Sequence, residues 1–590
     1  MFSPSHRFKI FLLVLLPIHT TSTFIQIKDI IERTSKEKDI STIAFFGQIY
    51  EFELELVMLA EANANIPRML YSESYGELYF AGDFNKNILL VACIDLWQRS
   101  MLNRIDNAFR GIHAASRSIF LVPGERYKNL RYLVEHFEWC WSRGFVNVLV
   151  IFLETNETFS YTPFPRMHVF RRTLDADEGT LFPDRFDNLM GFPIRTPLQY
   201  DPPRVYTYVD NLGRQILTGY CAELFLAFLQ RHNATLEEVR INNSTDYNMP
   251  AIVQLINRAK IDISIHTYMD IGGIRSSYPV RMMQWCIMVP SQGEINAYWY
   301  FIRPFQLQLW LSCLGVLIGL SFLVALEERL QGVHYDFGRS CCDVFRFFLC
   351  LPSNDSRPFE LRRGFRKILI FMLGFMLTNL YLAYLTSFLA KIILKPQIQT
   401  LAELVTKNIS ILTLDFEIPI VLKNRGLPEG FERLLVPISA TTISRPEHLM
   451  NNRSLAYTIT DDKAMFVLMQ QIHLRQPRYK IVDECVSTIP IGFLLAKQSS
   501  FEKILNRFIL RASACGFIYK WWSDMYATGL KAGILKVIPS TGKQTLPLTM
   551  QHFQFAWIAL VGGLLLATIC LVLEKIVHMV RRFRVVVVYQ

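Results

Sequence analysis

Hydrophobic positions form three long, nearly uncharged runs along this chain, at residues 305–326, 365–390 and 553–575. An α-helix needs about 20 mainly apolar residues to cross the hydrocarbon core of a bilayer. Each run therefore predicts one transmembrane helix. A fourth apolar run, at residues 340–352, is shorter and contains Arg346. Backbone that does not span the membrane persists at that depth only where protein or water surrounds it, so this run predicts a re-entrant pore loop.

The rest of the chain alternates between short apolar strands and amphipathic helices, the pattern of α/β domains. Residues 24–190 contain a buried-strand run at 146–153 and a helical stretch at 129–141, and they predict a small α/β N-terminal domain. Residues 191–300 and 395–550 repeat the alternation on either side of the predicted pore. Two such blocks predict a hinged α/β domain of two lobes that the pore insertion splits.

Individual elements follow from the same pattern within the two blocks. Before the pore it predicts helices at residues 219–230 and 252–259 and a strand at 261–265. After the pore it predicts two helices and three strands, the helices at 462–472 and 501–512 and the strands at 409–414, 456–460 and 491–497. Apolar residues recur at helical spacing in the predicted helices and run continuously in the predicted strands.

The chain begins with the pattern of a secretory signal peptide. Arg7 and Lys9 precede an apolar stretch at residues 10–18 and small polar residues at 20–23. We expect residues 1–23 to be a signal peptide, cleaved near its end, which places the mature N-terminus outside the cell. A signal anchor is the alternative reading, but the apolar stretch is too short to span a bilayer.

The net charge of +11 is distributed unevenly. Basic residues cluster beside the predicted spans, at 357–367 and 575–584. Because Lys and Arg favour the cytoplasmic flanks of membrane segments, both clusters and the tail at 576–590 are predicted to be cytoplasmic. The basic balance therefore indicates a multi-pass protein in contact with lipid, and we expect no nucleic-acid partner.

Glycosylation signals give an independent reading of the topology. Segments predicted to be extracellular contain N-x-S/T at Asn156, Asn233, Asn242, Asn243, Asn408 and Asn452. A further signal, at Asn354, falls in the pore-loop region, which this topology does not export. The 11 cysteines are too few for a disulfide scaffold, and the sequence leaves their pairing open.

Composition and motifs narrow the class of protein. The chain is 51% hydrophobic with a mean hydropathy of +0.22, which is too apolar for an ordinary soluble protein. In residues 24–190 the histidines His113, His136 and His168 are scattered, and that region lacks metal-ligand spacing, a Gly-rich phosphate loop and a nucleophile elbow. No acid, His or Cys constellation with catalytic spacing lies beside the predicted membrane segments. We therefore expect neither an enzyme nor a bound metal or cofactor.

Several short motifs carry a resemblance to a known family. The segment LYLAYLTSFLA matches the motif SYTANLAAFLT at five of eleven positions, namely Tyr381, Ala383, Leu385, Phe388 and Leu389. It is followed in order by PQIQTLAEL, IGFLLAKQS and YKWW. In these motifs the chain resembles the ionotropic glutamate receptor superfamily, and more closely its divergent insect branch, the chemosensory ionotropic receptors.

The resemblance implies a fold and a function. The fold would be an extracellular clamshell like a periplasmic binding protein, split by a pore of three spans and one re-entrant loop. The function would be that of a subunit of a ligand-gated, non-selective cation channel, tuned to taste or odour. Such a subunit assembles into a heterotetramer with co-receptors in the plasma membrane of sensory dendrites, with its C-terminus in the cytoplasm. An accessory subunit that binds no ligand and serves assembly or trafficking is the alternative.

The resemblance also implies a ligand site. Members that bind glutamate clamp its carboxylate with an arginine in the first lobe. Here that segment is shortened, and Arg275 is the candidate clamp, near Tyr268, although a surface or hinge arginine is the alternative. Thr460 aligns with the acid that binds the ammonium group, and Asp461 follows it. We therefore expect a small-molecule ligand other than glutamate.

Two further features depend on the resemblance. Cys350, Leu351 and Pro352 align with the tip of the re-entrant loop. Asp355 aligns with an acid whose ring in four subunits favours cations, although a solvated cytoplasmic aspartate is the alternative. The family's disulfide from Cys485 lacks its usual second cysteine, and Cys515 would replace it only with a different geometry.

Overall fold

We describe the chain in a computed structural model, which divides into two compact units. The first contains residues 1–288, 405–469 and 483–536, and the second contains residues 289–404, 470–482 and 537–590. The structure describes residues 18–37, 40–47, 66–71, 79–80, 87–94, 99–123, 130–173, 180–241, 247–270, 272–296, 299, 301–330, 337–351, 361–390, 394–438, 455–474, 476–539 and 550–588.

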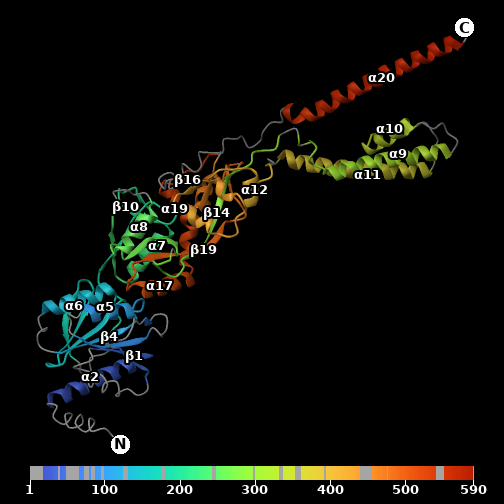
Figure 1. Cartoon of the computed structure of the whole chain (residues 1–590). Helices are drawn as coiled ribbons and strands as arrows, with labels where there is room; N and C mark the ends of the chain where they lie inside the picture. The colour runs from blue at the N-terminus through green and yellow to red at the C-terminus, as the bar shows by residue number, and fades with distance from the viewer. Residues whose placement is uncertain are drawn as a thin grey trace, which may run out of the picture. The chain divides into compact units, whose positions relative to one another are not determined.

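The N-terminal part of the first unit, labelled α2, β1, β4, α5 and α6 in Figure 1, contains a seven-stranded sheet. Its strand order is β2-β1-β3-β4-β5-β6-β7. The first five strands in this order are parallel, and the last two are antiparallel. Their bounds are β1 Thr42–Gly47, β2 Arg68–Tyr71, β3 Ile88–Cys93, β4 Arg117–Val122, β5 Asn147–Phe152, β6 Thr158–Thr162 and β7 His168–Arg172. The predicted strand at 146–153 corresponds to β5.

Both faces of this sheet are buried, which explains its continuous apolar runs. Phe46 packs in one core with residues of α5 (Arg99–Ala108) and α6 (Leu130–Arg143). Its neighbour Phe45 packs in the other core with residues of α2 (Ile18–Glu37). Because successive side chains of a strand point to opposite faces, helices cover both sides of this α/β sheet. The expected cleavage point near residue 23 lies within α2.

The second part of the first unit begins with strands β8 and β11, which are parallel, and the hairpin of β9 and β10. Two helices, α7 and α8, correspond to the predicted helices at 219–230 and 252–259. The bounds are β8 Pro193–Thr196, β9 Tyr206–Val209, β10 Gln215–Thr218, α7 Tyr220–Arg231, β11 Thr235–Glu238, α8 Met249–Asn257, β12 Ile263–Met269 and β13 Arg275–Ser276. The core of this part lies between α7, β12, β19 and α17.

A larger sheet combines strands that precede the apolar helices α9 and α11 in the sequence with strands that follow them. Its order is β12-β19-β14-β17-β15-β16. Strand β14 precedes those helices in the chain, and it is antiparallel to both β17 and β19, which follow them. The strands are β14 Arg281–Pro290, β15 Ile411–Leu414, β16 Leu435–Ile438, β17 Ala456–Thr460, β18 Tyr479–Ile481 and β19 Ser487–Leu495. One sheet is therefore completed only after the chain has passed through its apolar helices.

Strand β19 begins before the predicted strand at 491–497 because only its second half is fully buried. Its first four residues alternate between partly exposed and exposed positions while they pair with β14. The apolar run in the sequence covers only the buried half of β19, so the prediction missed the half that is paired with β14 but exposed. The accompanying helices are α12 Leu401–Thr406, α13 Ile418–Leu422, η4 Phe431–Leu434, α16 Asp461–Leu468, η5 Met469–Gln471, α17 Glu502–Ala514, α18 Phe517–Ser523 and α19 Met525–Lys531.

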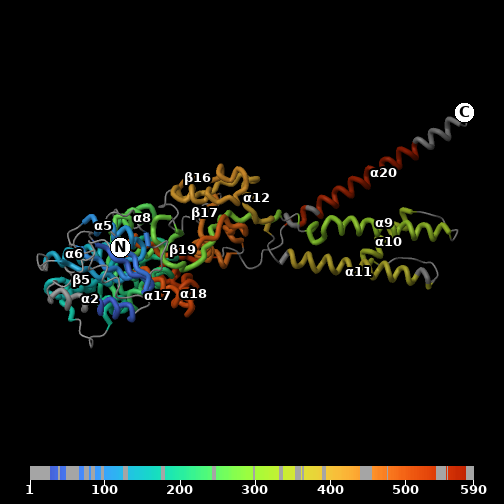
Figure 2. The backbone as a smooth tube through the Cα atoms, turned by 60° about the horizontal axis from the view of Figure 1, so that its bottom comes forward, coloured from blue at the N-terminus to red at the C-terminus, as the bar shows by residue number. Residues whose placement is uncertain are grey.

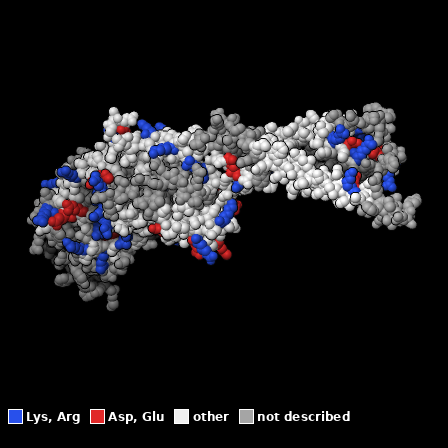
Figure 3. All heavy atoms as spheres, turned by 90° about the horizontal axis from the view of Figure 1, so that it is seen from above, with Lys and Arg blue, Asp and Glu red and all other residues white. Residues whose placement is uncertain are grey.

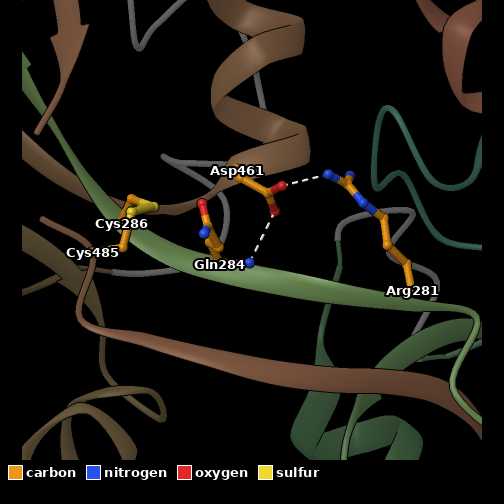
Figure 4. Close-up of a disulfide and its surroundings, with 5 residues drawn as sticks. All are labelled: Arg281, Gln284, Cys286, Asp461 and Cys485. Carbon is orange, nitrogen blue, oxygen red and sulfur yellow. Dashed lines mark hydrogen bonds and ion pairs between the residues drawn. A yellow bond between two sulfur atoms is a disulfide. The ribbon is translucent and has the colours of Figure 1, made fainter. Parts of the chain in front are cut away.

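A disulfide joins Cys286 of β14 to Cys485, just before β19 (Figure 4). Cys515 is an exposed free thiol, so the alternative that it pairs with Cys485 is wrong. The two bonded cysteines lie on segments that the sheet brings side by side, although 199 residues separate them. The disulfide therefore fastens the strand before the apolar helices to the chain after them.

Three helices of the second unit are long and apolar enough to cross a membrane, at Leu307–Leu330, Gly364–Phe388 and Ala556–Met579. They lie in α9 (Leu307–Leu330), α11 (Leu361–Ala390) and α20 (Gln554–Val588), and η6 (Met550–Phe553) precedes the last. At most 17% of each apolar window is buried within the chain, as expected for surfaces that face lipid or neighbouring subunits. Figure 3 shows few charged side chains along most of this helical surface.

The short helix α10 (Phe337–Phe348) packs against α9 and α11 (Figure 2). Val344 of α10 lies in a small core with Val324 of α9 and Ile370 of α11. At Gly374 of α11 an added Cβ would lie 2.3 Å from the carbonyl oxygen of Phe348, so the two backbones meet there with no room for a side chain. The segment predicted to be re-entrant therefore contains a helix held between two apolar helices.

Candidate functional site

The most deeply buried charges of the first unit form an ion pair between Arg204 and Asp462. Arg204 lies just before β9, and Asp462 lies in the first turn of α16. Arg204 donates from Nε to Oδ2 of Asp462 at 2.7 Å and from Nη2 to Oδ1 at 3.0 Å. The two side chains are only 3% and 0% exposed. This bidentate geometry is the one by which arginine recognises a carboxylate.

Neighbouring hydroxyl groups complete the hydrogen bonding of the pair. Tyr220 donates to Oδ2 of Asp462 at 2.8 Å, and Thr460 donates to Oδ1 at 2.5 Å. Burial alone would raise the pKa of Asp462, but the charge and hydrogen bonds of Arg204 and the hydrogen bond from Thr460 hold it well below its usual range. Asp462 is therefore a carboxylate throughout the physiological pH range.

Gly219 positions the arginine of this pair. Its φ of +114° is in the region that favours glycine. An added Cβ would lie 2.3 Å from the carbonyl oxygen of Arg204, which accepts hydrogen bonds from the amides of Cys221 and Ala222 at the start of α7. Only glycine lets the two backbones approach this closely.

A second ion pair joins the buried Asp201 to the partly exposed Lys463. The amide of Gln199 donates to Nε2 of His266 at 3.1 Å, so the neutral ring carries its proton on Nδ1, which lies 3.8 Å from Oδ2 of Asp201. Burial would raise the pKa of Asp201, but Lys463 and His266 hold it well below its usual range. The ammonium group of Lys463 also lies 5.1 Å from the ring centroid of Tyr247, within cation–π distance.

Glu417 adds a third carboxylate, at the N-terminus of α13. Burial raises its pKa to about 7, although Lys463 and Arg204 oppose the shift. Five buried polar atoms of this region have no hydrogen-bond partner within the described chain: Nε2 of Gln199, Oδ2 of Asp201, Nδ1 of His266 and the hydroxyls of Tyr247 and Tyr268. Oδ2 of Asp201 and Nδ1 of His266 face each other at 3.8 Å. Buried polar groups normally find a partner, so these atoms have hydrogen-bonding capacity left for water or for a bound molecule.

The residues predicted for the ligand site separate into two groups. Tyr268 and Thr460 lie within the cluster just described. Asp461 lies at its edge, where it accepts from Arg281 at 2.5 Å and from the amide of Gln284 at 3.2 Å (Figure 4). Arg275 is paired instead with Glu502 of α17 at 2.5 Å. The structure therefore brings three of the four predicted residues into one region and gives Arg275 a different partner.

The sequence analysis did not identify four charged residues of this cluster, namely Asp201, Arg204, Glu417 and Lys463. The only local sequence signal was the pair of consecutive acids after β17, Asp461 and Asp462. Arg204 lies in an irregular segment without periodicity, and its partner is 258 positions away. No local pattern marks such a residue.

The predicted gate residues lie on α11. Tyr381 donates from its hydroxyl to the carbonyl of Phe301 at 3.0 Å, and its ring contacts those of Phe305 and Trp310. Phe388 is partly buried, and Ala383 and Leu385 lie on the same helix. The side chain of Leu389 lies outside the described residues.

The predicted pore tip follows α10. Cys350 adopts a φ of +57° in the turn that ends this helix, and Leu351 is exposed. Pro352 and Asp355 lie outside the described residues. Their role in the pore stays a prediction.

Three of the predicted glycosylation sites are described by the structure. Asn156, Asn233 and Asn408 all adopt positive φ values in turns, and the last two are exposed. Asn242, Asn243 and Asn452 lie outside the described residues. Among the described residues, no group of three or more His, Cys, Asp or Glu side chains is placed to hold a metal ion.

The sequence is similar to that of a known receptor. No model of a known protein family matches the sequence. A stretch of 313 residues is 23% identical to the protein named Glutamate receptor 2.7 from Arabidopsis thaliana and covers 50% of this chain. It covers 31% of that relative, so the chain spans about a third of the curated protein it matches. This weak similarity supports the ionotropic glutamate receptor superfamily, and together with the three apolar helices it supports a membrane protein.

Proposed function

We propose that this chain is a subunit of a ligand-gated, non-selective cation channel of the ionotropic receptor type. One observation carries the proposal. Strand β14 ends before the apolar helices begin, yet its partners β17 and β19 lie beyond them in sequence. An α/β domain interrupted by a membrane insertion is the arrangement that lets a ligand-binding domain pull directly on a pore.

In this proposal the α/β part is a clamshell, and β14 and β19 are its crossing strands. Arg204 belongs to the first lobe and Asp462 to the second. A ligand biases the gate only through its difference in affinity between the open and closed clamshell. The helices α9, α11 and α20 are the three spans, and α10 with the tip that follows it is the re-entrant pore segment.

The finer assignment follows the insect chemosensory receptors. We propose a tuning receptor for taste or odour, assembled as a heterotetramer with co-receptor subunits in the plasma membrane of sensory dendrites. The mature N-terminus and the glycosylated segments are extracellular, and the C-terminal tail is cytoplasmic. The resemblance of the gate segment around Tyr381 supports this reading.

A second candidate function has its own support. In the structure the fork of Arg204 is filled by Asp462 of the same chain, which leaves that arginine unavailable to an external carboxylate. A subunit whose buried arginine is engaged by a carboxylate of its own chain, and whose candidate clamp Arg275 is paired with Glu502, is suited to a role in assembly or trafficking without ligand binding.

Current recording separates the two candidates. The chain is co-expressed with candidate co-receptors, and ligand-evoked current and surface delivery of the partners are measured together. The proposed channel gives current, and Asp355→Asn shifts its reversal potential when a large organic cation replaces sodium. Absence of current in every combination, with improved delivery of the partners, supports the accessory function.

Topology is tested separately by glycosylation mapping of single-site variants. The proposal expects glycans at Asn408 and Asn452 and none at Asn354. A glycan at Asn354, or none at either of the other two, contradicts the re-entrant arrangement.

A further inference from the structure

The helix α10 packs against α11 along one stripe of residues. Val344 of α10 lies in a core with Ile370 of α11. Four residues further along both helices, Phe348 meets Gly374. Residues four apart lie on the same face of a helix, so α10 and α11 run in parallel at this contact. The end of α10 that leads into the predicted pore tip therefore lies directly against α11.

This contact leaves no room for a side chain on α11. A Cβ at Gly374 would overlap the carbonyl group of Phe348, whose backbone atoms cannot turn away as the end of a side chain could. Gly374 is buried, although its neighbours Leu373 and Phe375 are exposed. Glycine is the residue that allows two backbones to approach this closely. Gly374 therefore sets the distance between the end of α10 and α11.

Polar groups hold the start of α10. Ser340 donates from Oγ to Oε2 of Glu328 on α9 at 3.1 Å. The residue before Glu328, Glu327, forms an ion pair with Arg366 of α11, and the two side chains are only 19% and 26% exposed. In Figure 3 acidic and basic side chains gather at one end of the otherwise nearly uncharged helical surface. Charges at the end of a membrane helix are stabilised by a partner of opposite sign, so this pair fixes α9 to α11 beside the start of α10.

From these contacts we infer that Gly374, Glu327 and Arg366 are positioning residues of the pore, which hold α10 in place and thereby set the aperture at its tip. The inference rests on the proposed function, because it concerns the pore segment of the same channel. The selectivity of a filter depends on the width of its narrowest part and on the groups that line it. A displacement of α10 moves Cys350 and Leu351, the first residues of the predicted tip, so selectivity depends on the contacts that hold α10.

The first test compares two glycines of the predicted spans. At Gly319 of α9 an added Cβ would meet nothing within 4 Å, whereas at Gly374 it would overlap α10. Gly374→Ala and Gly319→Ala gain the same helix propensity, so a difference between them reports the contact with Phe348. Each full-length variant is co-expressed with the candidate co-receptors, and the reversal potential is measured when a large organic cation replaces sodium. We expect Gly374→Ala to shift the reversal potential at unchanged surface delivery, and Gly319→Ala to leave it unchanged.

The second test needs no current. Cys350 is a partly buried free thiol in the turn that ends α10, and Cys515 is an exposed free thiol of the first unit. The purified full-length protein in detergent reacts with a maleimide, and mass spectrometry follows the modification of both cysteines. The reactivity of a thiol rises with its exposure, so Gly374→Ala should speed the modification of Cys350 severalfold. Cys515, and both cysteines of the Gly319→Ala protein, should keep the wild-type rates.

Charge reversal tests the ion pair. Glu327→Arg and Arg366→Glu each bring like charges together where the wild type has opposite ones. Each should speed the modification of Cys350 and shift the reversal potential, as Gly374→Ala does. The double variant restores opposite charges in exchanged positions, and we expect it to return both values toward those of the wild type. Such a rescue shows that the two side chains act through each other.

Two results would overturn the inference: a folded Gly374→Ala protein with the wild-type Cys350 rate and reversal potential, or a double charge variant as altered as the single ones. If Gly374→Ala does not fold, the charge variants decide alone. Failure of the channel proposal is distinguishable from these results. Altered Cys350 rates without current in any subunit combination keep the role of these contacts in holding α10 and remove the channel. Current with wild-type selectivity in all variants keeps the channel and removes the positioning role.

Discussion

The buried pair of Arg204 and Asp462 allows a quantitative test of what holds the two segments of the chain together. Arg204→Met leaves a carboxylate in a site that is 0% exposed, and Asp462→Leu leaves an unpaired guanidinium. Breaking a buried pair from one side costs about 3–5 kcal/mol. In the double variant neither charge remains, so we expect it to cost far less than the sum of the two single variants.

The assay is thermal unfolding of the full-length protein in detergent, followed by tryptophan fluorescence. For a domain of 150–250 residues, 1 kcal/mol shifts the melting temperature by about 2–4 °C, so each single variant should lose roughly 6–20 °C. The control is the surface pair of Arg214 and Asp210, whose side chains are 70% and 12% exposed, so that Arg214 is largely in water. Arg214→Met should change the melting temperature by no more than about 2 °C, because exposed pairs contribute little.

Additivity is the result that would refute this reasoning. If the loss in the double variant equals the sum of the two single losses, the side chains do not interact energetically, and the pair is not what joins the two segments. If either single variant behaves like the exposed control, the charges are solvated in the folded protein and not buried.

Three further predictions concern the same unit. The raised pKa of Glu417 means that the folded state holds its proton more tightly than the unfolded state, so stability falls as pH rises from 4.5 through about 7. Glu417→Gln should remove this decline, which amounts to as much as about 3 kcal/mol, when melting temperatures at pH 5 and pH 8 are compared. Gly219→Ala should displace Arg204 and cost at least about 2 kcal/mol, whereas Gly213→Ala, with open space around its Cβ, should cost about 1 kcal/mol by the same measurement. Cys286→Ser should cost about 2–4 kcal/mol, and a reducing agent should lower the melting temperature of the wild type to that of this variant without affecting the variant.

Much of the fold could be predicted from local pattern. Strand β17 coincides with the predicted strand at 456–460, and α17 covers the predicted helix at 501–512 with small differences at its ends. Larger differences arise where a paired residue is exposed, as in the first half of β19. Hydrophobic periodicity reports burial, and it is silent about strands whose hydrogen bonds form at the surface.

The candidate site was only partly predictable. Thr460 and Asp461 were identified by alignment with the resembling family, and the structure places them beside the buried pair. Arg204 carried no sequence signal, and Arg275, the predicted clamp, is paired with Glu502. An arginine's role depends on which carboxylate the fold brings to it, and this cannot be inferred from the residues on either side of it.

The sequence by itself determined the three apolar helices and the α/β character of the segments around them. Both depend on whether a local stretch of chain is apolar enough to be buried away from water, and its composition and hydrophobic periodicity indicate this. The tertiary structure alone decided the partners: Arg204 with Asp462 across 258 positions, and Cys286 with Cys485 across 199. These contacts form because β14 pairs with strands that follow the apolar helices in the sequence. The packing of the whole domain determines this strand pairing, and the sequence of a single segment does not.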